Sequence, residues 1–127
     1  MSSPLKQLHL WADAVLKKDI DALMSLYSKK ATLHPTLSSS TRNTPESIHE
    51  YFVGGATFKD YGFLNNGINN IKFEEIHEQA NTIAGEYHFK VIDDDKNELK
   101  NTKAKFTFCF DNDNLIIHHH SSLLYEK

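Results

Sequence analysis

The sequence predicts an α+β fold in which about three N-terminal helices pack on a strongly curved antiparallel sheet. Apolar residues recur at helical spacing in three segments between Leu5 and Phe52. From Ile68 onward apolar and polar residues alternate, as they do in strands that bury one face. Runs rich in Asp and Asn separate the alternating segments. We expect a single domain over residues 1–127, with the helices closing a cone around an internal pocket.

Two helices are expected before the first strand. Ser3 followed by Pro4 is typical of an N-cap with proline at the first helical position, and Asp19 provides a second cap. The apolar positions that follow these caps are Leu5, Leu8, Ala12, Val15 and Leu16 in the first helix and Ile20, Leu23, Met24 and Tyr27 in the second. We expect Trp11 and Tyr27 in the core rather than in a ligand site.

A short strand, a loop and a third helix follow. Residues 31–34 are apolar enough for the strand. Residues 35–43 are rich in Ser and Thr and are expected to form an ordered loop. Thr44 and Pro45 open the third helix, and Gly54 and Gly55 end it.

The second half of the chain is expected to form a meander of antiparallel strands. The segments that favour strands are Ile68 to Glu78, Thr82 to Ile92, Lys100 to Phe110 and Leu115 to Leu124. The runs from Asp93 to Glu98 and from Asp111 to Asn114 supply the chemistry of turns.

The last of these segments carries the run HHHSS, from His118 to Ser122, between aliphatic residues. Side chains alternate between the two faces of a strand. Uninterrupted alternation gives one face of Ile116, His118, His120, Ser122 and Leu124 and another of Leu115, Ile117, His119, Ser121 and Leu123. Imidazoles and hydroxyls among buried aliphatic groups need partners, which favours a small-molecule pocket. Apolar groups on both faces also favour a homodimer or larger homo-oligomer through the outer face of the sheet.

Composition narrows the class of protein. The net charge of −3 and the absence of a basic stripe argue against a nucleic-acid partner. No apolar stretch approaches the length of a membrane span, and the N-terminus lacks the pattern of a signal peptide. The single cysteine, Cys109, fits a reducing compartment. We therefore expect a cytoplasmic protein with no membrane partner.

Several motifs resemble a known superfamily in the family's order along the chain. The N-terminal pieces are W-A-x-x-x-L-K-K-D from Trp11, L-Y-S from Leu26 and A-T-L-x-P-T-L-S from Ala31. Arg42, Tyr51-Phe52, K-F-T-F-C-F from Lys105 and H-H-S-S from His119 follow. The chain resembles the nuclear-transport-factor-2-like, or SnoaL-like, superfamily with its cone-shaped, cystatin-like fold. It is most similar to the group related to the association domain of calcium/calmodulin-dependent protein kinase II. The H-H-S-S motif is also that of the iota-class carbonic anhydrases, some of which work without a metal.

The resemblance implies a pocket made by a Thr of the P-T-L-S loop, a Tyr of the third helix, and an alternating His and Ser of the last strand. On this chain the implied catalytic residues are Thr36, Tyr51, His120 and Ser122. The substrate-binding residues would be Thr36, Tyr51, Ser122, His118 and Arg42. The pair His120 and Ser122 is preferred to His119 and Ser121 because it continues the H-x-H-x-S rhythm that begins at His118.

The expected function is metal-independent, reversible hydration of carbon dioxide, with carbon dioxide and bicarbonate, or a small carboxylate, as the small-molecule substrate. His120 would accept the proton of the attacking water. No metal and no cofactor are expected. The main alternative is a non-catalytic module that binds a small anion or forms oligomers, like the kinase association domain. A zinc site on His118 and His120, with His34 or His88 as third ligand, is a further alternative. Isomerase or dehydratase chemistry is weakly supported, because no carboxylate lies in an apolar run.

Overall fold

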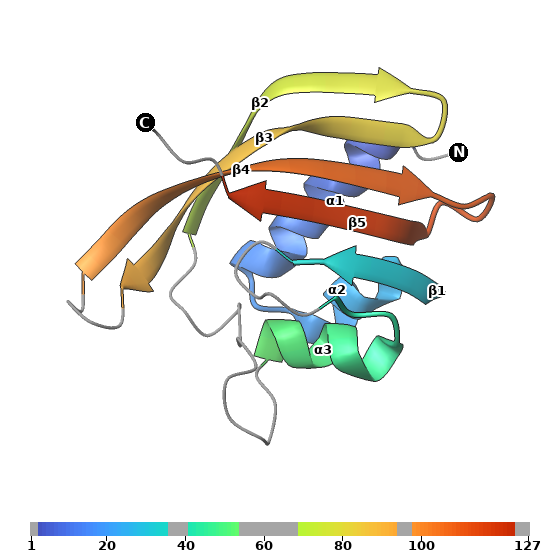
Figure 1. Cartoon of the computed structure of the whole chain (residues 1–127), viewed down its shortest axis with the longest axis horizontal. Coiled ribbons are helices and arrows are strands. Elements are labelled where there is room, and N and C mark those ends of the chain that lie inside the picture. Colours follow the sequence, from blue (N-terminus) through green and yellow to red (C-terminus); the bar gives the residue numbers. More distant parts are fainter. Residues whose placement is uncertain (1–2, 36–40, 54–68, 94–97, 124–127) are drawn as a thin grey trace.

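The computed structural model describes residues 3–35, 41–53, 69–93 and 98–123. Helices and strands follow the chain in the order α1 (Pro4–Leu16), α2 (Ile20–Ser25), β1 (Tyr27–His34), α3 (Pro45–Val53), β2 (Asn69–Gln79), β3 (Thr82–Asp93), β4 (Glu98–Phe110) and β5 (Ile116–Leu123) (Figure 1). The α+β fold predicted from the sequence is confirmed. The expected end of the third helix at Gly54 and Gly55 lies outside the described residues.

The helix starts agree with the predicted caps. The Ser3 Oγ accepts a hydrogen bond from the backbone N–H of Lys6 at 3.2 Å, and Asp19 Oδ1 accepts one from Ala22 at 3.1 Å. These bonds satisfy N–H groups that have no partner within the helix. Among the described residues no helix is long and apolar enough to cross a membrane.

The five strands form one sheet in the order β1-β5-β4-β3-β2. The β2-β3, β3-β4 and β4-β5 pairs are antiparallel, as expected. The β1-β5 pair is parallel, so the sheet is mixed rather than wholly antiparallel. The last strand of the chain therefore lies inside the sheet, between β4 and β1 (Figure 1).

The first strand is longer than the sequence predicted. The second helix ends at Ser25, and β1 begins at Tyr27, which was expected on that helix. The backbone N–H of Ile116 donates to the Leu26 carbonyl at 2.7 Å and joins the start of β5 to this junction. Pairing with β5 thus extends β1 and turns Tyr27 into a strand residue.

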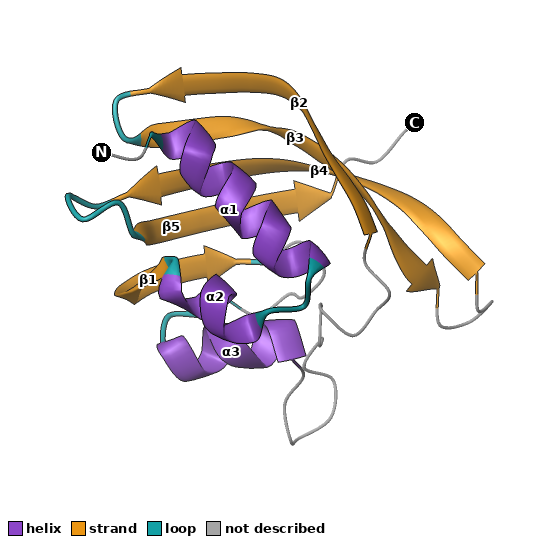
Figure 2. Cartoon of the chain, turned by 180° about the vertical axis from the view of Figure 1, so that it is seen from behind, coloured by secondary structure: helices purple, strands orange, loops and turns teal. Residues whose placement is uncertain are grey.

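The helices cover one face of the sheet, and the core lies between the two layers. Figure 2 shows α1 lying across the strands, with α2 and α3 beside β1. The largest fully buried side chains are Trp11, Phe52, Phe108, Phe110, Leu8, Leu23, Leu33, Ile48, Ile83, Ile116 and Val15. Trp11 and Tyr27 are both buried, as the sequence predicted.

A close backbone approach occurs where β2 departs from regular pairing. The register of β2 on β3 shifts between Glu74 and His77, and Glu75 has a positive φ of 53°. Opposite this bulge lies Gly85, where an added Cβ would stand 3.0 Å from the Glu74 carbonyl oxygen and 2.9 Å from Ile76 Cδ1. Glycine at this position lets the bulged strand pack closely on β3.

Candidate functional site

The alternation of β5 differs from the uninterrupted pattern assumed from the sequence. The pairing with β4 is regular from Ala104 to Cys109 and shifts between Cys109 and Phe110, so that Phe110 pairs with Ile116 and Cys109 with His118. The extra residue, Ile117, forms a bulge. The bulge places Ile116 and His119 on the same face, although they are an odd number of residues apart.

The inner face of β5 consequently carries His119 and Ser121. These two residues pair with the buried Phe108 and Phe106 and are only 2% and 4% exposed. His120 and Ser122 are exposed on the outer face. His120 and Ser122, the pair preferred from the H-x-H-x-S rhythm, therefore lie on the face opposite to the buried pair, because the bulge at Ile117 shifts the alternation by one residue.

His119 is enclosed by aromatic side chains. Its ring stacks on Phe108 with a centroid distance of 4.0 Å and meets Trp11 edge-on at 5.7 Å. The Nδ1 atom lies 2.9 Å from the hydroxyl oxygen of Tyr27, and that oxygen accepts a hydrogen bond from Trp11 Nε1 at 3.1 Å. The histidine is therefore held in one orientation by stacking and by a hydrogen-bonded chain.

Burial controls the charge states of His119 and Tyr27. It lowers the pKa of His119 well below its ordinary value of 6.5, and the neighbouring His118 and His120 lower it further. Burial also raises the pKa of the Tyr27 phenol. Both side chains are accordingly neutral near pH 7, because a charged form would lose its hydration without gaining an opposite charge.

A small internal cavity adjoins His119. Its volume is about 10 Å³, and its lining residues are Trp11, Leu33, Pro35, Tyr51, Phe52, Tyr87 and His119. The Nε2 atom of His119 is buried and has no hydrogen-bond partner within the described part of the chain. A volume on this scale holds about one water molecule. The site thus offers one unsatisfied polar atom in a mostly aromatic and aliphatic enclosure.

Other polar groups lie around this cavity. The Tyr87 hydroxyl and the Ser121 hydroxyl are hydrogen-bonded to each other, and Tyr87 also stacks on Trp11 at 5.8 Å. Tyr51 of α3, a predicted site residue, is 3% exposed and lines the cavity. The structure therefore brings Tyr51 together with His119 rather than with His120.

Arg42 lies beside this site but is held by its own loop and helix. Its guanidinium carbon is 5.9 Å from the centre of the Tyr51 ring, within the range of cation–π attraction. Its Nη1 donates to the Ser47 carbonyl at 2.9 Å and lies 4.0 Å from Glu50 Oε2. These contacts hold Arg42 next to Tyr51, and Arg42 does not line the cavity. Thr36 lies outside the described residues, one position after the cavity-lining Pro35.

Three histidines meet on the outer face of the sheet. The ring of His34 on β1 lies 5.5 Å from that of His118 and 5.7 Å from that of His120. The other candidate third ligand, His88, lies elsewhere, with its Nε2 3.5 Å from Glu74 Oε2. Within residues 3–35, 41–53, 69–93 and 98–123 no group of three or more His, Cys, Asp or Glu side chains is arranged to hold a metal ion.

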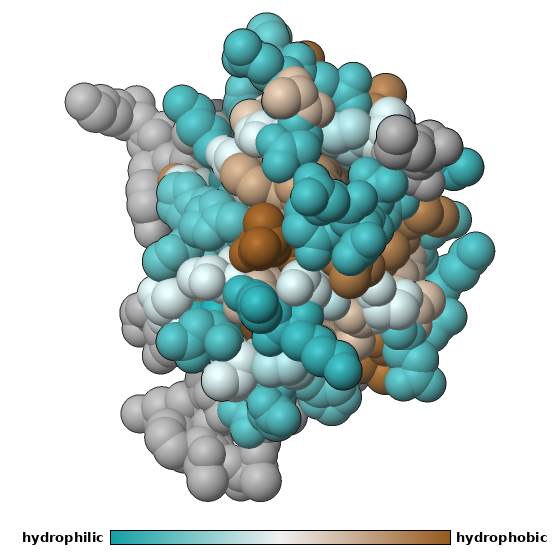
Figure 3. All heavy atoms as spheres, turned by 90° about the vertical axis from the view of Figure 1, so that its right-hand side faces the viewer, coloured by the Kyte–Doolittle hydropathy of each residue, from teal (hydrophilic) through white to brown (hydrophobic). Residues whose placement is uncertain are grey.

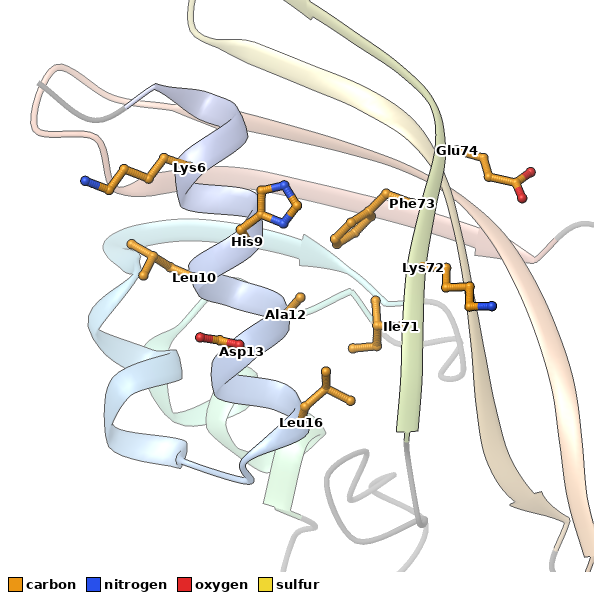
Figure 4. A pocket seen from close by; sticks show the side chains of 10 residues that line it. All are labelled: Lys6, His9, Leu10, Ala12, Asp13, Leu16, Ile71, Lys72, Phe73 and Glu74. Carbon is orange, nitrogen blue, oxygen red and sulfur yellow. The ribbon is translucent and has the colours of Figure 1, made fainter.

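A larger hollow, of about 670 Å³, lies between α1 and β2. Figure 4 shows Ile71 and Phe73 pointing from β2 toward α1, while Lys72 and Glu74 point to the other side of the strand. The groove is lined on the helix side by exposed or half-exposed residues such as Leu10 and Leu16. It shares no lining residue with the internal cavity and offers no buried polar group, so we assign the candidate site to the internal cavity.

The hydroxyls of Tyr27 and Tyr87 were not among the site groups expected from the sequence. Both tyrosines are buried, and the aromatic ring alone explained their positions in the pattern. A buried tyrosine nevertheless carries an O–H group that needs a partner. That rule was the available signal that these residues belong to a polar network.

Comparison with known proteins gives one family match and many structural relatives. A family model described as metal-independent carbonic anhydrase matches residues 8–123. No curated protein matches the chain in sequence.

Similar solved structures share the fold. A protein from Xanthomonas campestris described as a calcium/calmodulin dependent protein kinase II association domain is 23% identical, with a TM-score of 0.68 over 100% of this chain and 95% of the other. A nuclear-transport-factor-2-like protein from Cytophaga hutchinsonii is 10% identical, with a TM-score of 0.70 over 98% and 92%. An epoxide hydrolase/cyclase-like enzyme of pyran ring formation in salinomycin is 14% identical, with a TM-score of 0.77 over 98% and 95%. These structures, all below 25% identity, share the fold expected from the sequence, and the family match confirms the resemblance to metal-independent carbonic anhydrases.

Proposed function

Since the chain belongs to the metal-independent carbonic anhydrase family, we propose that it catalyses the reversible hydration of carbon dioxide at the internal cavity beside His119, with the attacking water held in that cavity. The observation that carries this proposal is the buried, unpartnered Nε2 of His119 on a cavity of about one water molecule. Such an atom is a ready hydrogen-bond partner for a water or for an oxygen of bicarbonate.

The chemistry requires positioning more than strong activation. The oxygen of a water molecule forms a bond to the carbon of carbon dioxide, one water O–H bond breaks, and the proton passes to the buffer. Negative charge then develops on the oxygens of bicarbonate. Fixed hydrogen-bond donors in a site without bulk water stabilise that charge strongly. Holding the two small reactants in contact lowers the entropic part of the barrier.

We assign the roles of the last strand to the inward-facing residues. His119, the buried member of its pair, takes the place in the pocket expected for His120, as a hydrogen-bond partner of water or bicarbonate and not as the acceptor of the proton. Ser121, the buried counterpart of Ser122, is proposed to position the hydroxyl of the cavity-lining Tyr87, to which it is hydrogen-bonded. Tyr51 and Thr36 keep the roles implied by the family resemblance, as groups that hold water and bicarbonate. His118 and Arg42 are proposed to act indirectly, since neither lines the cavity.

The test compares two adjacent histidines on opposite faces of one strand. Carbon dioxide hydration is followed by stopped flow with chelator-treated protein. We expect the wild-type rate to exceed the buffer rate and His119→Gln to lose at least about tenfold of the excess, as for the loss of one preorganised donor or acceptor. His120→Gln is the matched control and should retain the activity, because its side chain is exposed on the outer face.

Each alternative has its own outcome. Equal loss in both variants, or loss only in His120→Gln, would contradict the assignment to the inner face. Wild-type protein without excess activity that still binds bicarbonate would favour the small-anion-binding module. Activity that depends on added zinc, and disappears in His34→Ala, would favour the outer histidine cluster instead.

Because the chain is similar to a protein described as a kinase association domain, we propose in addition that the protein assembles as a homodimer or larger oligomer, although the exposed surface itself gives this proposal little support. The described outer face of the sheet is less apolar than the sequence suggested. Among its described residues, the large hydrophobic side chain that is exposed is that of Ile117, at 37%. The end of the molecule that carries the β2-β3 and β4-β5 turns is also mostly hydrophilic, interrupted by smaller hydrophobic areas (Figure 3). Light scattering that gives a monomer mass at micromolar concentration would refute this assembly.

A further inference from the structure

The hydrogen-bonded chain behind His119 has a defined direction. An indole N–H is a donor only, so Trp11 Nε1 must donate to the Tyr27 hydroxyl oxygen across their 3.1 Å contact. The Tyr27 hydroxyl retains one hydrogen to donate. Its other neighbour is His119 Nδ1, at 2.9 Å.

The buried setting of the tyrosine decides where that hydrogen goes. Tyr27 is 6% exposed and His119 is 2% exposed, and buried polar groups are almost always paired. If His119 Nδ1 carried the ring proton, it would have to donate to Tyr27. The tyrosine O–H would then have no acceptor among the partners that the structure gives it. With the hydrogen of Tyr27 directed at Nδ1, all three groups are satisfied.

We infer that Trp11 and Tyr27 are positioning residues that hold His119 as the Nε2–H tautomer, so that the histidine presents a hydrogen-bond donor to the internal cavity. A neutral imidazole with its Nδ1 lone pair engaged by Tyr27 has no free lone pair at Nε2. The fit is therefore to an oxygen that accepts, as in bicarbonate or a small carboxylate. Because burial keeps the ring neutral near pH 7, only one of its two nitrogens carries a proton, and the ring has a defined tautomer.

This inference deepens the proposed function and rests on it where catalysis is concerned. In carbon dioxide hydration, His119 would stabilise an oxygen of bicarbonate rather than accept the proton of the attacking water. The tautomer itself follows from the Trp11-Tyr27-His119 geometry and is measurable without any activity.

The experiment uses the full chain labelled with nitrogen-15. Long-range nitrogen–proton correlation spectra distinguish the two tautomers by the shifts of the ring nitrogens, and His119→Gln identifies the signals. We expect the wild-type protein to show the Nε2–H form. A dominant Nδ1–H form would overturn the inference. His120, which neighbours His119 but is exposed, is an internal reference in the same spectra.

Two variants test the positioning roles. Tyr27→Phe removes the donor to Nδ1, and Trp11→Phe removes the donor that fixes the direction of the Tyr27 hydroxyl. Each should shift His119 toward a mixture of tautomers and leave the His120 signals unchanged. If either variant folds and retains a pure Nε2–H form at His119, the role assigned to the substituted residue is wrong. The wild-type measurement decides the tautomer even if both variants fail to fold.

Bicarbonate tests the ligand class. Titration with sodium bicarbonate should shift the Nε2 and Hε2 signals of His119, and His119 signals that do not move would overturn the assignment to an oxygen anion. Failure of catalysis is separable from these results: a pure Nε2–H tautomer that responds to bicarbonate, in protein without hydration activity, supports the inference and refutes the enzyme. An active protein with the Nδ1–H tautomer would support the enzyme and refute the inference.

Discussion

Replacement of Tyr27 by phenylalanine isolates one oxygen atom at the centre of the protein. The aromatic ring packs near Phe52, at a centroid distance of 6.1 Å, and this packing is preserved in the variant. The hydroxyl that accepts from Trp11 and bonds His119 is lost. Two buried groups, an indole N–H and an imidazole nitrogen, are then left without their partner.

The size of the effect follows from those two groups. A buried polar group without a partner costs about 1–3 kcal/mol, so we expect Tyr27→Phe to lower the free energy of unfolding by about 3 kcal/mol. Unfolding entropy near about 2.1 cal/mol/K per residue gives a chain of 127 residues about 0.27 kcal/mol/K. The melting temperature should therefore fall by about 11 °C.

The assay is urea unfolding at pH 7.5, a condition chosen well above the lowered pKa of His119. The protein has a single tryptophan, Trp11, whose emission reports the core, and circular dichroism gives an independent transition. The exposed His120→Ala, as control, should change stability by less than about 0.5 kcal/mol.

A double-mutant cycle measures how strongly the side chains of Tyr27 and His119 depend on each other. In the wild-type background, His119→Phe leaves the Tyr27 hydroxyl without an acceptor. In the Tyr27→Phe background, His119→Phe instead removes a ring nitrogen that has already lost its partner. The second substitution should therefore cost about 1–3 kcal/mol less in the Tyr27→Phe background. Additive losses, or a loss below about 0.5 kcal/mol for Tyr27→Phe, would refute the view that this hydroxyl satisfies two buried partners.

Three further predictions concern charge and packing. Because the pKa values of His118 and His119 are lowered in the folded protein, the unfolded chain binds more protons below about pH 6.5, so stability should fall as the pH drops from there toward the folded-state values. Urea unfolding at stepped pH should show this loss, and His119→Phe should flatten it. His34→Ala removes a neighbour that lowers the pKa of His118, and nuclear magnetic resonance titration should find that pKa closer to 6.5; an unchanged value would mean that burial and His120 set it without His34. Gly85→Ala places a Cβ 3.0 Å from the Glu74 carbonyl oxygen and should cost about 1–3 kcal/mol in thermal unfolding, and a neutral result would show that the bulge yields easily.

The fold was largely predictable because local signals and the global fold agree. Ser3 and Asp19 cap the helices where expected, and the long strands begin and end within two residues of their predicted bounds. The parallel pairing of β1 with β5 was not predictable from periodicity, since partner and direction depend on contacts between distant parts of the chain. The same pairing explains why Tyr27 is in a strand.

The site was predictable in its residue types and not in its geometry. The resemblance pointed to the run from His118 to Ser122 and to Tyr51, and the structure places Tyr51 and His119 on one cavity; their roles stay predictions. Alternation alone could not assign the faces, because a single bulged residue, Ile117, reverses the parity of everything after it. Turn and bulge geometry depends on the partner strand, which a single-sequence pattern does not contain.

The parallel pairing of β1 with β5 has a consequence for the order in which the protein forms. Tyr27 pairs in register with Ile116, so this contact joins the beginning and the end of the chain. Contacts of such long range form slowly, because the entropy of closing the intervening loop must be overcome first. During synthesis, Trp11, Tyr27 and Tyr51 leave the ribosome long before His119. Trp11 and Tyr51 can therefore form the cavity with His119 only after the last strand has been synthesised.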